Sequence, residues 1–244
     1  MSKKLTLACM ALVAFAAFAL PATASASPRL CETIENTCVG HTLATGVKIH
    51  AHNVGNTLMT NGGATLVTCT AATMTGTLTR NDATAVEGTI EKATFTGTGA
   101  GGKCTSALAG DTTVTTKPSE GEAAWNGLPW CVKASGAADT FTVRGGACSE
   151  ASRAITFVLH TSNIGTCRYT RSTAVEGTLT THTSSSEDAV LTVSGTGEEG
   201  ITKTKFTKEA GSGVLCPETG TLDMSFTMTT DNEPTFTTLY IENV

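Results

Sequence analysis

Two histidines in one short segment have the spacing that best suits metal chemistry. His50 and His52 are separated by one residue, and residues i and i+2 of a β-strand project from the same face. Two imidazoles on one face could begin a copper or zinc site. Lys48 shares that face and would repel a cation. We therefore expect a solvated polar face here, with no bound metal and no cofactor.

Acidic residues offer one candidate pair for hydrolysis. Glu87 and Glu176 occupy equivalent positions in two copies of the hexapeptide TAVEGT, residues 84–89 and 173–178. A glycoside hydrolase needs two carboxyl groups about 5–10 Å apart in a cleft, which spacing along the chain does not establish. We interpret the pair as exposed charges that discourage pairing of strand edges.

Two glycine-rich segments match the dinucleotide-binding pattern GxGxxG, at residues 97–102 and 195–200. That pattern binds a pyrophosphate only where a strand precedes it and a helix follows. Residues 201–208 alternate as a strand does, and the first copy runs into Cys104, so we expect two hairpin turns. The sequence also contains no nucleophile elbow, SxxK or HExxH motif. These observations favour a protein that is not an enzyme.

The two tryptophans of the chain are close together, at positions 125 and 130. An exposed indole could stack on a sugar ring or on an apolar ligand. Trp130 directly precedes Cys131, and β-sandwiches often bury a tryptophan beside a disulfide. We expect Trp130 to be buried, which leaves Trp125 as the candidate ligand-binding residue.

The first residues predict export. Two lysines precede an uncharged apolar run, residues 5–20, which ends at Pro21 and is followed by an Ala-Ser-Ala cleavage site. The run is short for a membrane-spanning helix, and no later segment is apolar enough to span. We expect a signal peptide over residues 1–26, cleavage after Ala26, and a secreted or cell-envelope protein without a membrane span.

Eight cysteines remain after cleavage, and an even number in an exported chain is typical of a disulfide framework. No CxxC pair occurs, which argues against structural zinc and against thioredoxin-like redox chemistry. Counting alone allows about a hundred pairings. The simplest joins neighbours along the chain: Cys31–Cys38, Cys69–Cys104, Cys131–Cys148 and Cys167–Cys216.

Composition indicates the elements that must position these residues. Threonine accounts for 49 of the 244 residues and glycine for 25, while only 15% are charged. Threonine favours strands and glycine favours turns, so coiled coils and helical bundles are excluded. The net charge of −5 provides no basic surface for nucleic acid.

Alternation of apolar and polar residues predicts the strands themselves. Over residues 221–229 every even position is apolar and every odd position is polar, as in a half-buried strand. About thirteen to fifteen short strands separated by Gly, Asn and Asp clusters are typical of a sandwich or barrel. We predict an all-β, disulfide-stapled antiparallel β-sandwich, with a partly closed β-barrel as the alternative.

The repeated hexapeptide suggests an internal duplication, although chance similarity in so biased a sequence is an equal alternative. After the signal peptide we expect a Cys31/Cys38 segment and then one all-β domain. A segment that contains the tryptophans would join its two similar halves. The ranges are 27–60 for the first segment, 61–244 for the domain, and 61–118 and 160–244 for the halves.

The order of several residues resembles a group of small exported Thr/Gly-rich all-β bacterial proteins of actinobacterial type, and more distantly the secreted alkane-oxidation-activator proteins. The resemblance depends on Cys69-x6-Gly76, Phe95-x-Gly97, Cys104, Leu128-Pro129-Trp130, Cys167, Cys216 and Leu239-Tyr240. It implies an exported, non-enzymatic role at the cell surface or in the extracellular matrix.

From these observations we expect an exported, non-catalytic surface, matrix or ligand-binding protein. Its partner would be a surface or matrix component, or a small apolar or glycan ligand. One alternative is a secreted hydrolase acting on glycans. Another is a disulfide-stapled inhibitor that presents a rigid loop, such as residues 180–188, to a secreted partner.

Overall fold

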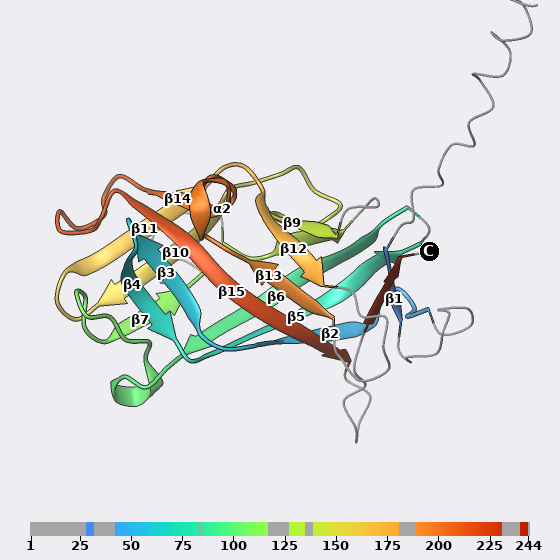
Figure 1. The fold of residues 1–244 in the computed structure, drawn as a ribbon, viewed down its shortest axis with the longest axis horizontal. Helices are drawn as coiled ribbons and strands as arrows, with labels where there is room; N and C mark the ends of the chain where they lie inside the picture. Colours follow the sequence, from blue (N-terminus) through green and yellow to red (C-terminus); the bar gives the residue numbers. More distant parts are fainter. Residues whose placement is uncertain are drawn as a thin grey trace, which may run out of the picture.

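The computed structural model describes residues 28–31, 42–82, 84–116, 127–134, 139–180, 189–230 and 240–243. These residues form sixteen strands, one short 3-10 helix and one short α-helix (Figure 1). The all-β prediction is therefore confirmed. The predicted signal peptide, Cys38, Trp125 and most of the proposed inhibitory loop lie outside the described residues.

Eight antiparallel strands close into a barrel. Each is hydrogen-bonded to the next, and the last pairs with the first, so this sheet has no free edge. In order around the wall the strands are β13 (Val190–Val193), β12 (Val175–Thr180), β9 (Thr140–Gly145), β8 (Trp130–Ala134), β6 (Val86–Thr96), β5 (Ala71–Asn81), β2 (Lys48–Asn53) and β15 (Thr219–Thr230).

A second group of strands continues from the barrel through β15. The first half of β15 pairs with β14 and β3, while its second half pairs with β13 and β2 of the barrel. The long red strand of Figure 1 shows this shared course. The outer strands are, in order, β7 (Thr112–Thr115), β10 (Ile155–Thr161), β11 (Gly165–Arg171) and β14 (Lys205–Lys208), with β3 (Thr57–Asn61) and β4 (Ala64–Cys69) beyond β15.

The prediction of a β-sandwich is wrong, because the eight strands close into a barrel. The alternative prediction, a partly closed β-barrel, is closer to the observed fold. A sandwich and a barrel both require strands with one apolar face and one polar face. The local pattern is therefore the same in both, and only the pairing of β13 and β2 with β15 decides between them.

The alternation predicted for residues 221–229 is confirmed. Leu222, Met224 and Phe226 are buried, and these three side chains and Met228 line the interior of the barrel. On the other face Asp223 accepts a hydrogen bond from the backbone N–H of Gly195 at 2.7 Å. A slip of one residue would reverse both faces, so this contrast fixes the register of β15.

Phe157 of β10 links the outer strands to one end of the barrel. Its ring contacts those of Phe95, Trp130 and Phe206 edge-to-face, with centroids 6.0, 5.4 and 5.3 Å apart. Trp130 is only 2% exposed, as predicted from its place beside Cys131. This aromatic cluster closes the barrel at the end where β6 meets the outer strands.

The first strand, β1 (Pro28–Cys31), lies at the opposite end of the barrel wall, where it pairs with β16 (Tyr240–Asn243). The Asn81 side chain, at the end of β5, holds it there. Asn81 accepts a hydrogen bond from Leu30 N at 2.9 Å and donates to Leu30 O at 2.7 Å and to Leu43 O at 2.9 Å. Leu30 is thereby placed against the barrel interior.

Three of the four predicted disulfides are confirmed: Cys69–Cys104, Cys131–Cys148 and Cys167–Cys216. The predicted Cys31–Cys38 bond is not tested, because Cys38 lies outside the described residues. Structural disulfides persist in oxidising surroundings, so the three bonds indicate an extracellular environment. Over the described ranges, no helix has the length and hydrophobicity needed to cross a membrane.

The α-helix α2 (Gly197–Thr204) corrects one sequence prediction, because a strand was expected from residue 201 onward. Only Lys205–Lys208 is a strand. Glu199 and Lys203 pair one turn apart at 2.5 Å, and Thr204 donates to the Gly200 carbonyl at 2.9 Å. The Glu199–Lys203 pair stabilises the helix, and the alternation of residues 201–208 gives no sign of it.

Ionisation of Tyr169, on β11, should lower the free energy of unfolding at alkaline pH. Its ring is fully buried and its hydroxyl donates to the Pro217 carbonyl at 3.0 Å. Burial raises the pKa of this phenol to about 12, whereas an unfolded tyrosine ionises near pH 10. The protonated phenol therefore supports the fold fully below about pH 10. Its contribution is lost, by about 1.4 kcal/mol per pH unit, as pH rises toward 12.

Denaturant unfolding at several pH values from neutral to 11 would test this prediction. The wild-type unfolding free energy should decline above pH 10 more steeply than that of Tyr169→Phe, which has no phenol to ionise there. The variant starts lower at neutral pH, because it loses one hydrogen bond worth about 1 kcal/mol. Parallel declines in both proteins would exclude Tyr169 as the titrating group.

Candidate functional site: an apolar cavity inside the barrel

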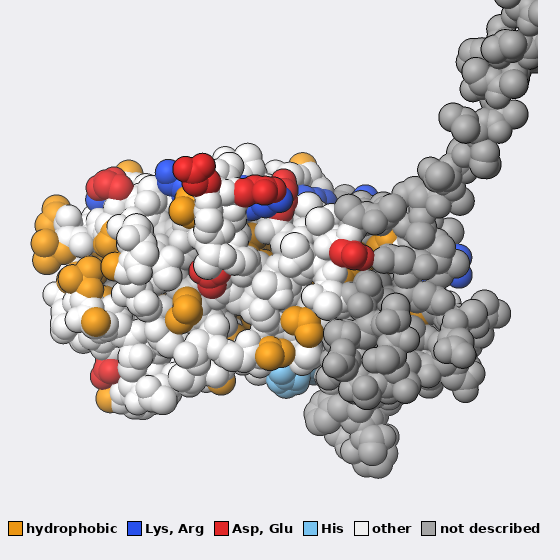
Figure 2. All heavy atoms as spheres, viewed as in Figure 1, with side chains coloured by type: hydrophobic (Ala, Val, Ile, Leu, Met, Phe, Trp, Pro, Cys, Tyr) orange, Lys and Arg blue, Asp and Glu red, His pale blue; other side chains and the backbone are white. Residues whose placement is uncertain are grey.

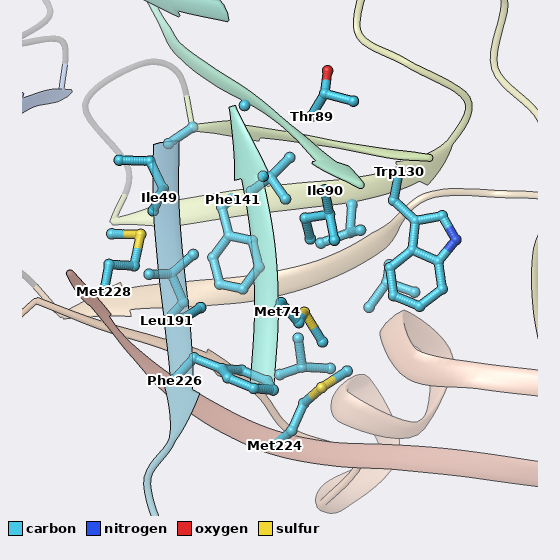
Figure 3. Close-up of a pocket in the computed structure, with 18 of the residues that line it drawn as sticks. Ile49, Met74, Thr89, Ile90, Trp130, Phe141, Leu191, Met224, Phe226 and Met228 are labelled. Atoms are coloured by element: carbon cyan, nitrogen blue, oxygen red, sulfur yellow. The ribbon is translucent and has the colours of Figure 1, made fainter. Parts of the chain in front are cut away.

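The barrel encloses a cavity of about 140 Å³. Its wall combines side chains from every barrel strand with Leu30 at one end and with Phe157, Phe206 and Leu222 at the other. Figure 3 shows that the labelled aromatic, methionine and branched aliphatic side chains converge on one space. Interiors of proteins are normally packed without voids of this size, so the cavity is the leading candidate site.

Among the residues that the structure describes, none that lines the cavity is charged. Two of the three threonines along its wall have hydrogen-bond partners elsewhere: Thr77 bonds to Lys48 and Glu91, and Thr89 accepts from Cys148 N at 3.5 Å. The Thr89 side chain points away from the space in Figure 3. A ligand inside would therefore meet mainly carbon and sulfur, an environment that favours neutral, apolar molecules.

The indole nitrogen of Trp130 is the exception in this wall. Nε1 is buried and has no hydrogen-bond partner within the described part of the chain. It lies on the ring edge that faces away from the other labelled side chains (Figure 3). The six-membered part of the ring, and not the N–H group, is presented to the cavity.

The two TAVEGT copies supply equivalent parts of the wall. Each copy, with the aliphatic residue that follows it, places a valine, a glycine and a larger aliphatic residue at alternate positions: Val86, Gly88 and Ile90 in β6, and Val175, Gly177 and Leu179 in β12. All of these except Gly177 line the cavity. Both strands belong to the barrel, but β5 before β6 is a barrel strand, whereas β11 before β12 is an outer strand. Duplication of two halves stays a prediction.

The two glycines of these copies differ in what surrounds them. A Cβ atom added at Gly177 would overlap the Phe141 ring, so the space above this glycine is already filled. At Gly88 the nearest atom to an added Cβ, leaving out the adjoining residues, would be Thr77 O at 3.6 Å, an ordinary contact. Gly88 therefore leaves room that belongs to the cavity.

The histidine pair lies outside this site. Ile49 and Ala51 of β2 line the cavity, so His50 and His52 project outward with Lys48, as predicted. Lys48 pairs with Glu91 at 2.6 Å on that face. Within the ranges described here, no group of three His, Cys, Asp or Glu residues has the geometry to hold a metal ion.

The two residues of the candidate carboxylate pair lie on strands that are not neighbours in the barrel wall. Glu87 lies on β6 and Glu176 on β12, with β8 and β9 between them. Three strand spacings amount to about 14 Å, beyond the separation that glycoside hydrolysis uses. Glu87 instead pairs with Lys133 at 2.9 Å and with Arg80 at 3.8 Å. The structure does not bring these two residues together.

The second GxGxxG segment has the strand and helix that its pattern requires, but not the electrostatics. β13 precedes it and α2 follows, with Glu198 and Glu199 in the first helical turn. The backbone N–H of Gly195 is already bonded to Asp223. A phosphate would meet three carboxylates here. The first segment contains the 3-10 helix η1 (Ala100–Gly102). Neither segment forms the predicted hairpin turn, because β6 does not pair with β7 and β13 does not pair with β14.

Comparisons with known proteins identify no family for this chain. A scan against protein-family models, a search of curated proteins and a search of solved structures gave no match. The resemblance to exported Thr/Gly-rich bacterial proteins therefore stays a prediction, and the functional argument depends on the cavity itself.

Proposed function

We propose that this protein is an exported binding protein, not an enzyme, and that it holds one small, neutral, apolar molecule inside its barrel. The observation that supports the proposal is the cavity of about 140 Å³ with its wall of apolar side chains. Eight-stranded barrels are just wide enough to hold one small ligand. An apolar cavity of about 150 Å³ in another protein stays dry and binds benzene.

The energetic cost of the cavity also favours a ligand. At about 24 cal/mol per Å³ of void, an empty space of this size lowers stability by about 3 kcal/mol. A Cβ atom at Gly88 would make only an ordinary contact, so a side chain there would occupy part of this space and remove part of that cost. Space kept at the expense of stability is typical of functional sites. The size of the cavity indicates a ligand of about one aromatic ring, smaller than most cofactors.

Toluene is a suitable probe, since it is neutral, apolar and of this size. We expect one site per chain with a dissociation constant of about 0.1–1 mM, which corresponds to about −5 kcal/mol. Binding to the native state alone should raise the midpoint of thermal unfolding, and above the dissociation constant the rise should follow the logarithm of ligand concentration. Calorimetry and thermal unfolding would measure both. Phenylacetate, which carries a charge, should not bind.

Gly88→Leu is the variant that separates cavity binding from binding elsewhere. The added side chain should fill the cavity, abolish toluene binding and raise the unfolding free energy by about 1–2 kcal/mol, because apolar surface is buried and a flexible glycine is removed. Thr94→Leu is the control: it adds the same side chain on β6 at an exposed position and should bind toluene normally.

Undiminished toluene binding by folded Gly88→Leu would contradict the proposed site. Failure of the wild-type protein to bind any small apolar probe would contradict the proposed function.

A further inference from the structure

Two large apolar residues occupy the corners of an exposed turn before β15. Cys216 N donates to Gly213 O at 3.0 Å, so Val214 and Leu215 are the central residues of a β-turn. Val214 is 95% exposed and Leu215 65%. Corner positions usually hold Gly, Pro, Asn or Asp, each for a conformational reason. We call Val214 and Leu215 the apolar tip.

The tip is held outward by contacts on both sides. Gly213 N donates to Thr166 O at 2.9 Å, and Arg168 N donates to Ser212 Oγ at 3.0 Å. The Cys167–Cys216 disulfide joins the end of the turn to β11. A turn tied to a strand by two hydrogen bonds and a disulfide cannot fold its side chains back onto the protein. The exposure is therefore built into the fold.

Further apolar surface surrounds the tip. Leu108, which is 52% exposed, lines a small hollow together with Ile164 and Pro217. Gly213 lies close against the Ile164 carbonyl, which places the tip beside this hollow. Figure 2 shows hydrophobic side chains gathered at the end of the molecule formed by the outer strands, away from β1.

The positive and negative side chains near the tip are equal in number. Lys208 pairs with Glu218 and also donates to the Cys216 carbonyl at 3.2 Å. Arg168 lies beside Gly211, and Glu209 follows β14. Two cations and two anions leave no local charge, while the whole chain carries −5. A strongly anionic surface would therefore be repelled by the chain and not attracted by the tip.

We infer that the apolar tip inserts into a neutral lipid surface. Val214 and Leu215 together expose roughly 200–300 Å² of side chain, well below the ~800 Å² per partner that a stable protein–protein interface buries. A lipid surface needs no complementary shape and accepts a convex apolar protrusion, which gains free energy with each apolar group buried. Zwitterionic lipid is the surface that suits a tip without local charge.

Sedimentation with vesicles of pure phosphatidylcholine tests this inference on the full chain. The wild-type protein should cosediment weakly and reversibly. The double variant Val214→Ser/Leu215→Ser should partition at least tenfold less. The matched control, Val54→Ser/Ile201→Ser, changes two other exposed apolar residues and should stay within about twofold of wild type. Toluene binding should be unchanged in both variants, since neither pair lines the cavity.

Vesicle binding that is equal in the tip variant and the wild type would overturn the inference, as would binding that requires anionic lipid or no binding at all. If toluene did not bind, the inference about the apolar tip would still stand, because the two experiments test separate surfaces of the protein. Unchanged thermal unfolding of both double variants would show that they are folded.

Discussion

Phe226→Ala should lower the free energy of unfolding by about 3–5 kcal/mol. The ring is 6% exposed, lies on β15 between Leu191 of β13 and Asn53 of β2, and forms part of the cavity wall. Its removal would enlarge an existing void, so the surrounding side chains have little means of filling the space. The unfolding midpoint in urea, with the slope unchanged, measures the loss.

Thr227→Ala is the control on the neighbouring residue. Thr227 faces outward on the same strand, where a side-chain truncation should cost less than about 1 kcal/mol. Equal midpoints for the two variants would mean that β15 is not a strand with one buried face, and the barrel would lose its closing strand.

Removal of the Cys167–Cys216 disulfide should cost about 4 kcal/mol. The two cysteines are 49 residues apart, and a bond that closes a long loop strongly restricts the unfolded chain. The double variant Cys167→Ala/Cys216→Ala avoids free thiols and leaves little extra volume to fill. Chemical denaturation without reductant would give the difference in unfolding free energy.

The shorter loop provides the comparison. Cys131 and Cys148 are 17 residues apart, and Cys131→Ala/Cys148→Ala should cost about 3 kcal/mol on the same basis. Removing the disulfide that closes the longer loop should therefore lower the free energy of unfolding more. The reverse order would show that native contacts around the bonds, and not the unfolded chain, determine their effect.

Local pattern was enough to predict the buried face of β15 but not the closure of the sheet. The alternation around Phe226 and the burial of Trp130 depend on neighbouring residues only, and both predictions are confirmed. Closure requires β2 to meet β15, across more than 160 residues. No periodicity within a strand contains that information, so the sandwich and the barrel were equally compatible with it.

The candidate site was harder to predict for a related reason. A cavity is the difference between the volume that eight strands enclose and the volume that their side chains fill, so no single residue indicates it. The nearest signal was the alternation Val86, Gly88, Ile90, in which a glycine interrupts an inward row. The apolar tip had a plainer signal, since Val214 and Leu215 follow a Gly-Ser-Gly turn.

The shared strand β15 also has a consequence for biosynthesis. Its two halves complete β2 and β3 from the first third of the chain and β13 and β14 from the last third. A ribosome synthesises these partners before it reaches residue 219, so four strand edges remain open until β15 emerges. Open edges readily pair with other chains. The chain is therefore exposed to such pairing until its last long strand has joined the sheet.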